Sequence, residues 1–211
     1  MVPNAATDVL LIVDLQNDFC PGGALPVANA DQIVPIINSI AQRFAHIILT
    51  QDWHPTDHIS FASAHPGAKP YEIVEAAYGP QALWPDHCVQ GSDGAAFHPA
   101  LHVPQAELIL RKGFRKDIDS YSVFVENDHL TSTGLAGYLR ERGLKRLFLC
   151  GLAYDFCVRH SAIDGTALDF DCIVIQDACR AVGLPGSVVA TDQAFAEAGV
   201  QRINSSDLLT V

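Results

Sequence analysis

Short apolar runs alternate along the chain with segments in which apolar residues recur every three or four positions. Continuous runs rich in branched residues are typical of strands buried on both faces of a parallel sheet. The wider spacing is typical of amphipathic helices. The expected strands span residues 9–14, 46–51, 107–111, 145–150, 171–176 and 201–203, and the expected helices span 29–44, 133–142, 155–168 and 186–198, with Asn29 as N-cap of the first helix.

This alternation of strands and helices predicts right-handed βαβ units and a parallel sheet with helices on both faces. The expected fold class is α/β, a three-layer α/β/α sandwich with a mostly parallel central sheet, built as a single domain over residues 1–211. Residues 52–105 interrupt the alternation because they are rich in Pro, His, Gly and aromatic side chains and lack periodicity. A long irregular insertion is usually functional or disordered, and its aromatic residues favour a packed wall of an active site.

Composition and charge narrow the range of partners. With 24 acidic against 13 basic side chains and a net charge of −11, the chain has no basic stripe for nucleic acid and no attraction to an anionic membrane surface. No apolar stretch approaches the ~20 residues that span a bilayer, and we expect no signal peptide. The six cysteines form no C-x-x-C pair, which favours a reducing, cytoplasmic setting. We therefore expect a small-molecule substrate, and a homo-oligomer is compatible with the sequence.

Three of the apolar runs lead to a reactive side chain. Asp14 ends the first run, Lys112 follows the third expected strand, and Cys157 follows the fourth after a turn that begins with glycine. The carboxyl ends of parallel strands meet at one edge of the sheet, where open α/β sheets place their active sites, so the three groups are expected to converge. An acid, an amine and a thiol together suit amide chemistry through a cysteine nucleophile.

Each of these residues also has a purely structural interpretation: Cys157 as a packed thiol, Asp14 as a strand-end cap, Lys112 as a solvated surface charge. In the first turn of a helix, however, unpaired backbone N–H groups and the positive end of the helix dipole lower the pKa of a thiol and can hold an oxyanion. Asp14 is then the expected base, because partial burial raises its pKa toward that of the thiol. Asp18, four residues further along, is the weaker candidate.

The insertion contains a candidate site for one divalent metal ion. Asp52 and His54 are two residues apart, so on an extended backbone their side chains point to the same side. With His87 they would supply three ligands and leave open positions, which is typical of a functional ion. Oxygen and imidazole donors suit Zn²⁺, the first expectation, and also Fe²⁺ or Mn²⁺. The sequence leaves open whether His58 ligates directly, ligates through water or caps a turn, and Ser60 is a weaker candidate.

Taken together, these residues resemble the nicotinamidase/pyrazinamidase branch of the isochorismatase-like cysteine hydrolases. The metal-binding segments distinguish this branch from metal-free relatives. The matching segments follow the family's order over nearly the whole chain: 13–19 (VDLQNDF), 51–55 (QDWHP), 58–61 (HISF), 84–91 (WPDHCVQG), 111–113 (RKG), 119–122 (DSYS) and 151–158 (GLAYDFCV).

The resemblance implies an isochorismatase-like hydrolase fold and the hydrolysis of nicotinamide to nicotinate and ammonia, a step in NAD salvage, with pyrazinamide as an analogue. It implies that the metal binds the pyridine nitrogen and that a cis peptide bond precedes the oxyanion turn. The implied site residues are Asp14, Lys112 and Cys157 as catalytic triad, the backbone N–H groups of Ala153 and Cys157 as oxyanion hole, Asp52, His54 and His87 as metal ligands, and Phe19, Trp84 and, more weakly, Tyr121 beside the ring.

Two positions depart from the family pattern: Tyr154 stands where a small Thr is usual, and Phe156 where Tyr is common. We expect the bulkier Tyr154, beside the oxyanion turn, to narrow or re-aim the mouth of the pocket. The range of accepted amides would change with it, while the triad would stay intact.

Three other functions are alternatives to this predicted amide hydrolysis. A related amidase for ureido or carbamoyl compounds would lack the metal ligands. A nucleotide-binding domain would carry a G-x-G-x-x-G or Walker loop, and neither occurs in the sequence. A redox or metal-storage protein using His87 and Cys88 would release metal without producing ammonia.

Overall fold

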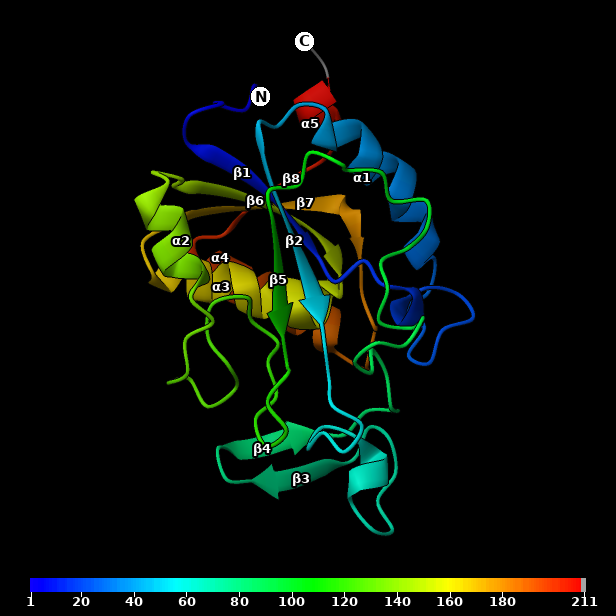
Figure 1. Ribbon diagram of the computed structural model, residues 1–211. Helices are drawn as coiled ribbons and strands as arrows, with labels where there is room; N and C mark the ends of the chain where they lie inside the picture. Colours follow the sequence, from blue (N-terminus) through cyan, green and yellow to red (C-terminus); the bar gives the residue numbers. More distant parts are fainter. Residues whose placement is uncertain (210–211) are drawn as a thin grey trace.

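The centre of the computed structural model, which describes residues 1–209, is a six-stranded sheet in the order β5-β2-β1-β6-β7-β8 (Figure 1). All neighbouring strands in it are parallel. β1 is buried over its whole length, as expected for a central strand covered on both faces. The strands of the sheet are β1 (Asp8–Val13), β2 (His46–Asp52), β5 (Leu108–Lys112), β6 (Arg146–Leu152), β7 (Asp171–Arg180) and β8 (Gln201–Ile203).

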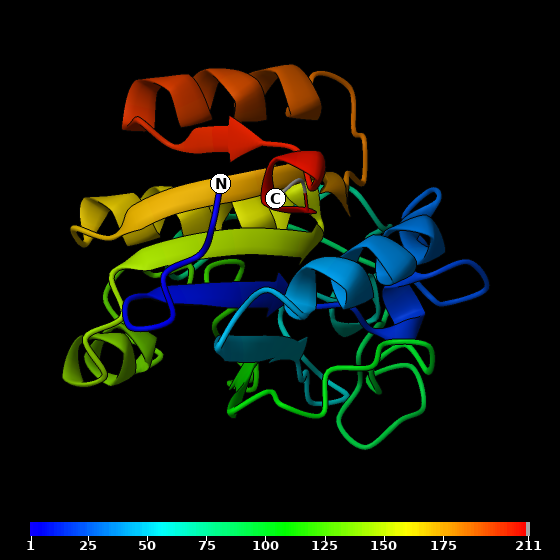
Figure 2. The same cartoon turned by 90° about the horizontal axis from the view of Figure 1, so that it is seen from above.

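Helices cover both faces of the sheet (Figure 2). α1 contacts β7 on one face, while α3, which also contacts β7, packs with α4 on the other. This arrangement confirms the predicted α/β/α fold class and its parallel sheet. No helix within residues 1–209 combines the length and apolar character needed to cross a bilayer. The helices are α1 (Val34–Ala41), α2 (Leu135–Glu141), α3 (Arg159–Ala167), α4 (Ser187–Ala198) and α5 (Ser206–Leu209).

The first helix is shorter than the pattern predicts. A 3-10 turn at Ala30–Ile33 precedes α1, which ends at Ala41. Asn29 occupies the N-cap position of this 3-10 turn, but its side chain does not cap a helix N–H: the residue is left-handed with a φ of 57°, and its Oδ1 accepts a hydrogen bond from Gln32 Nε2. Pro35, in the first turn of α1, has no N–H to donate, which suits the start of a helix.

The connection from β6 to α3 also differs from a regular helix start. A π turn at Tyr154–Val158 precedes α3, and the peptide bond between Leu152 and Ala153 is cis, as the resemblance implies. Just before it, Gly151 has a φ of 112°, and a Cβ there would lie 2.1 Å from the carbonyl oxygen of Val13. The carboxyl ends of β1 and β6 therefore approach too closely for any other residue.

The insertion contains a hairpin that the sequence pattern does not predict. Its strands are β3 (Ile73–Ala76) and β4 (Gly79–Ala82), and a 3-10 turn at Ala62–Ala64 precedes them. The hairpin lies beyond the carboxyl ends of β2 and β5 (Figure 1). The two strands are short, and neither sequence, IVEA or GPQA, alternates apolar and polar residues as a recognisable strand does. The hairpin is also poorly covered, with Ile73 72% exposed.

Candidate active site

Asp14, Lys112 and Cys157 meet at the carboxyl edge of the sheet. Lys112 Nζ lies 2.8 Å from Asp14 Oδ2 and 3.3 Å from Cys157 Sγ. The strands that lead to Asp14 and Cys157, β1 and β6, are direct neighbours, whereas β5, which carries Lys112, is separated from β1 by β2. The long lysine side chain spans that strand, so three groups remote in sequence share one buried cluster.

The ammonium group of Lys112 is the centre of this cluster. Besides Asp14 and Cys157 it contacts Asp52 Oδ1 at 2.5 Å and donates to the carbonyl oxygen of Ser120 at 2.9 Å. Thr50 Oγ1 donates to Asp14 Oδ1 at 2.6 Å and fixes the carboxylate. Two carboxylates around one ammonium keep the pKa of Lys112 well above its usual range, although burial opposes this.

The expectation of a lowered thiol pKa is wrong for this structure. Burial raises the pKa of Cys157 well above its usual value, which outweighs the opposing effect of Lys112, and hydrogen bonding to Asp14 raises it further. Burial likewise raises the pKa of Asp14, although Lys112 opposes the shift. The resting site therefore favours a neutral thiol beside a carboxylate that is more basic than a free aspartate.

Asp52, His54 and His87 converge beside this cluster. One ligand atom from each lies within 4.8 Å of the others, with Asp52 Oδ2 at 3.6 Å from His54 Nε2 and 4.0 Å from His87 Nε2. The Nδ1 atoms face the carbonyl oxygens of Gly113 and Pro85, both at 2.8 Å. A carbonyl only accepts, so each Nδ1 donates and each Nε2 lone pair is free for a cation. The residues therefore fit a divalent metal.

His58 and Ser60 lie behind this trio. The His58 ring packs on the His54 ring with centroids 4.2 Å apart. Its Nε2 faces the carbonyl oxygen of Ile118 at 3.3 Å and must donate, so its Nδ1 accepts from Ser60 Oγ at 2.7 Å. With both nitrogens engaged, His58 buttresses His54 in this structure, and it also forms a second group with His54 and Asp119 that could hold a metal ion.

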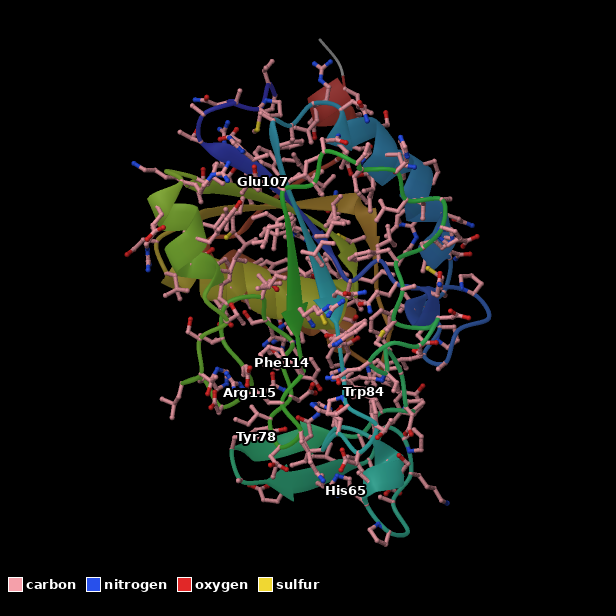
Figure 3. All side chains as sticks on the ribbon, in the orientation of Figure 1. His65, Tyr78, Trp84, Glu107, Phe114 and Arg115 are labelled. Atoms are coloured by element: carbon pink, nitrogen blue, oxygen red, sulfur yellow. The ribbon has the colours of Figure 1, made fainter. Side chains whose placement is uncertain are left out.

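A cavity opens onto the thiol and the trio. Phe19, Trp84 and Tyr121 line it as the resemblance implies, and Trp84 Nε1 donates to Tyr121 Oη at 3.1 Å. Figure 3 shows Trp84 between the carboxyl ends of β2 and β5 and the β3–β4 hairpin. A small apolar pocket with a few polar groups at one end suits a small aromatic amide. Ala153 and Cys157, whose N–H groups are expected to hold the oxyanion, also line it.

The expected effect of Tyr154 on the pocket mouth is wrong. Its hydroxyl donates to Asp192 Oδ1 at 2.6 Å and its ring packs edge-on against Phe195, both in α4. Tyr154 does not line the pocket; Phe156 does, with its ring edge-on to Trp84 at 4.9 Å. The two side chains leave the π turn in different directions. Which of them faces the pocket therefore depends on the backbone conformation of the turn.

The pocket also contains residues that the sequence did not single out as site residues. They are Leu25, Asp119, Phe156 and Val182. Asp119 and Phe156 belong to matching motif segments, so the signal for them was present in the sequence. Leu25 and Val182 lie in loops without periodicity, and no local pattern marks them.

Similar proteins align with most of the chain. It is 53% identical over 200 residues to a nicotinamidase of Acinetobacter baylyi, covering 95% of this chain and 94% of the relative. A solved Acinetobacter baumannii nicotinamidase/pyrazinamidase superposes with a TM-score of 0.95 at 51% identity, covering 96% and 98% of the two chains.

Two more distant solved structures contain bound groups. The L. infantum protein PnC1, in complex with nicotinate, has a TM-score of 0.87 and 38% identity, covering 99% of this chain and 98% of its own. A pyrazinamidase of Pyrococcus horikoshii, in complex with zinc, has a TM-score of 0.75 and 32% identity, covering 93% and 98%. The isochorismatase domain model matches residues 8–204, and the chain therefore belongs to the isochorismatase family.

Proposed function

We propose that this protein hydrolyses nicotinamide to nicotinate and ammonia, and accepts pyrazinamide as an analogue. The observation that carries the proposal is the buried contact of Lys112 Nζ with both Asp14 and Cys157, at the end of an aromatic pocket next to three side chains that could hold a metal ion. The identity of 53% to a nicotinamidase over almost the whole chain supports the choice of substrate. Purified protein should release ammonia from nicotinamide, with nicotinate as the only other product, and a lack of ammonia would refute the proposal.

Proton transfer inside the cluster starts the reaction. Asp14 takes the proton of the Cys157 thiol, and the net charge of the cluster is unchanged because a carboxylate and a thiol become a carboxylic acid and a thiolate. The Lys112 ammonium stabilises either form, which lowers the cost of the transfer in a buried site. Burial raises the pKa of Asp14, so this carboxylate is a stronger base toward the thiol than a free aspartate would be.

The thiolate then attacks the carboxamide carbon. The oxyanion lies against the N–H groups of Ala153 and Cys157, and Asp14 returns its proton to the departing amine, so that ammonia leaves and a thioester forms. Water, deprotonated by Asp14, hydrolyses the thioester and restores the thiol. The aromatic rings of Trp84 and Phe156 hold the substrate ring and exclude bulk water from the thioester.

Asp52, His54 and His87 would hold a divalent metal ion, and we infer zinc from the donor set and from the Pyrococcus horikoshii structure. When bound, the ion would supply Lewis-acid chemistry at the pyridine nitrogen, which would orient the carboxamide toward the thiol. Asp52 contacts both this site and Lys112, so the same carboxylate holds the ammonium in place.

Removing the metal should abolish most of the activity. After dialysis against a chelator, we expect ammonia release to fall by about 10²-fold or more, since orientation of the reacting groups is lost. Metal analysis should find one equivalent per chain before dialysis and none afterwards. Adding Zn²⁺ should restore turnover, and full activity in the metal-free protein would contradict the prediction.

Phe156 should determine substrate affinity, and Tyr154 should not. Phe156→Ala removes a ring that packs on Trp84 in the pocket, so we expect KM for nicotinamide to rise about tenfold from the lost apolar contact. Tyr154→Phe keeps the ring against α4 and should leave KM within twofold. Steady-state kinetics on both variants checks this, and equal effects on KM would contradict it.

We infer a cytoplasmic setting from the thiols. All six cysteines are free and buried, Cys157 among them. A reducing compartment keeps a nucleophilic thiol available, whereas oxidation of Cys157 would remove it from the reaction.

A further inference from the structure

Asp155 lies between the two residues that are expected to hold the oxyanion, yet its side chain does not line the pocket. It is 2% exposed and accepts three hydrogen bonds. Oδ1 accepts from the N–H of Val182 at 2.9 Å, and Oδ2 accepts from the N–H of Gly183 at 2.9 Å and from Ser187 Oγ at 2.5 Å. Hydrogen bonds to a carboxylate are roughly twice as strong as neutral ones, so three of them make a firm connection.

The two segments that Asp155 connects, the turn 153–158 and the loop 182–187, both reach the pocket. On one side, the carbonyl oxygen of Ala153 accepts the N–H groups of Phe156 and Val158, both at 3.1 Å, which closes residues 153–158 into one unit that carries Cys157. On the other side, Val182 lines the pocket and Ser187 begins α4.

A second bond ties the same turn to the same helix. Tyr154, the residue before Asp155, donates its hydroxyl to Asp192 of α4. Two consecutive residues of the turn are thus anchored on α4, whereas Phe156 and Cys157, the next two, face the substrate. Asp155 holds the amino-terminal end of α4, and Tyr154 holds its middle.

From these contacts we propose that Asp155 is a positioning residue: its carboxylate fixes the turn 153–157 on the loop 182–187, so that the Cys157 sulfur and the oxyanion N–H groups keep their reactive arrangement. The proposal rests on the proposed amide hydrolysis at Cys157. It assigns Asp155 no contact with substrate and no proton transfer. A displacement of about 1 Å in such an arrangement is enough to cost about 10²-fold in rate.

The test is Asp155→Ala compared with Asp177→Ala. Asp177 is a matched control because it also accepts a backbone N–H and a hydroxyl, both from Ser205, at 2.7 and 2.6 Å, and it does not line the active-site pocket. The assay uses metal-loaded protein at a temperature well below the thermal unfolding midpoints of both variants. Under these conditions we expect kcat for Asp155→Ala to fall about 10²-fold. Asp177→Ala should keep kcat within about threefold.

A readout independent of turnover separates positioning from general destabilisation. Nicotinaldehyde should add the Cys157 thiol across its carbonyl: the sulfur bonds to the carbon and the thiol proton passes to the oxygen, which lies on the oxyanion N–H groups, whereas nicotinate should only occupy the pocket. Asp155→Ala should weaken aldehyde binding about 10²-fold, in step with kcat, and leave nicotinate binding within about threefold. Equal weakening of both ligands, or a loss no larger than in Asp177→Ala, overturns the proposal.

Two milder variants decide the matter if Asp155→Ala does not fold. Asp155→Asn keeps one acceptor oxygen but turns an NH₂ group toward a donor, and Ser187→Ala removes one of the three donors. Both should lose aldehyde affinity by a smaller factor, about tenfold or less, with nicotinate affinity retained. If the wild-type protein binds the aldehyde but releases no ammonia from nicotinamide, the proposed function fails while the positioning role is still decided by the aldehyde series.

Discussion

Cys157→Ala should lower ammonia release from nicotinamide by at least about 10⁴-fold while leaving the fold and the metal in place. The thiol is the group in the pocket that can form a covalent bond to the carboxamide carbon, and no neighbouring side chain can take its place: Lys112 is held as a cation by two carboxylates. The measurement is kcat from a coupled ammonia assay, together with metal content and the thermal midpoint.

Cys150→Ala is the matched control. Cys150 is buried as well, but it lies inside β6 and its sulfur contacts the carbonyl oxygen of Leu11, away from the pocket. Deleting its sulfur costs about 1 kcal/mol of stability and should leave kcat within a factor of two. Substantial turnover in Cys157→Ala would rule out the thioester, and a trapped acyl adduct on Cys157 in the wild-type protein would support it.

The parts of the site that lie at strand ends could be predicted from the sequence. Asp14 follows the fully buried β1, and Lys112 ends β5, an edge strand that is partly exposed but still has an apolar run, so both could be placed at the carboxyl edge before any coordinates. The pattern could not give the strand order. β2 separates β5 from β1, and only the length of the Lys112 side chain brings its ammonium to Asp14.

The orientation of residues in turns and loops could not be predicted. Phe156 lines the pocket and Tyr154 does not, because a π turn, which has no sequence signature, sets where each side chain points. The pKa of Cys157 was misjudged for a related reason. Helix position and nearby charge can be estimated from sequence, but burial, which is the largest cause of the raised pKa, depends on how the chain packs in three dimensions.

Lys112→Met should destabilise the protein by about 3–5 kcal/mol at neutral pH, because it leaves two buried carboxylates without their common cation. Methionine fills a similar volume, so the effect is electrostatic and not that of a cavity. Activity should be lost as well, since a thiolate would no longer be stabilised. The control is Lys116→Met: Lys116 pairs with Asp57 on the surface, where both side chains are more than half exposed, and its loss should leave the unfolding midpoint unchanged.

The pH dependence identifies the cause of the destabilisation. In the wild-type protein burial raises the pKa of Asp52, but Lys112 and His54 outweigh it and hold the pKa below its usual value, so this group contributes stability above pH ~4 that is lost on acidification. Without Lys112, burial and mutual repulsion should raise the pKa of Asp14 and Asp52 above their unfolded values. The variant then gains stability relative to wild type as the pH falls and both acids are protonated. Urea unfolding at neutral and acidic pH should show the gap between the two proteins narrowing toward acid, and a gap independent of pH would mean that Lys112 acts through packing instead of charge.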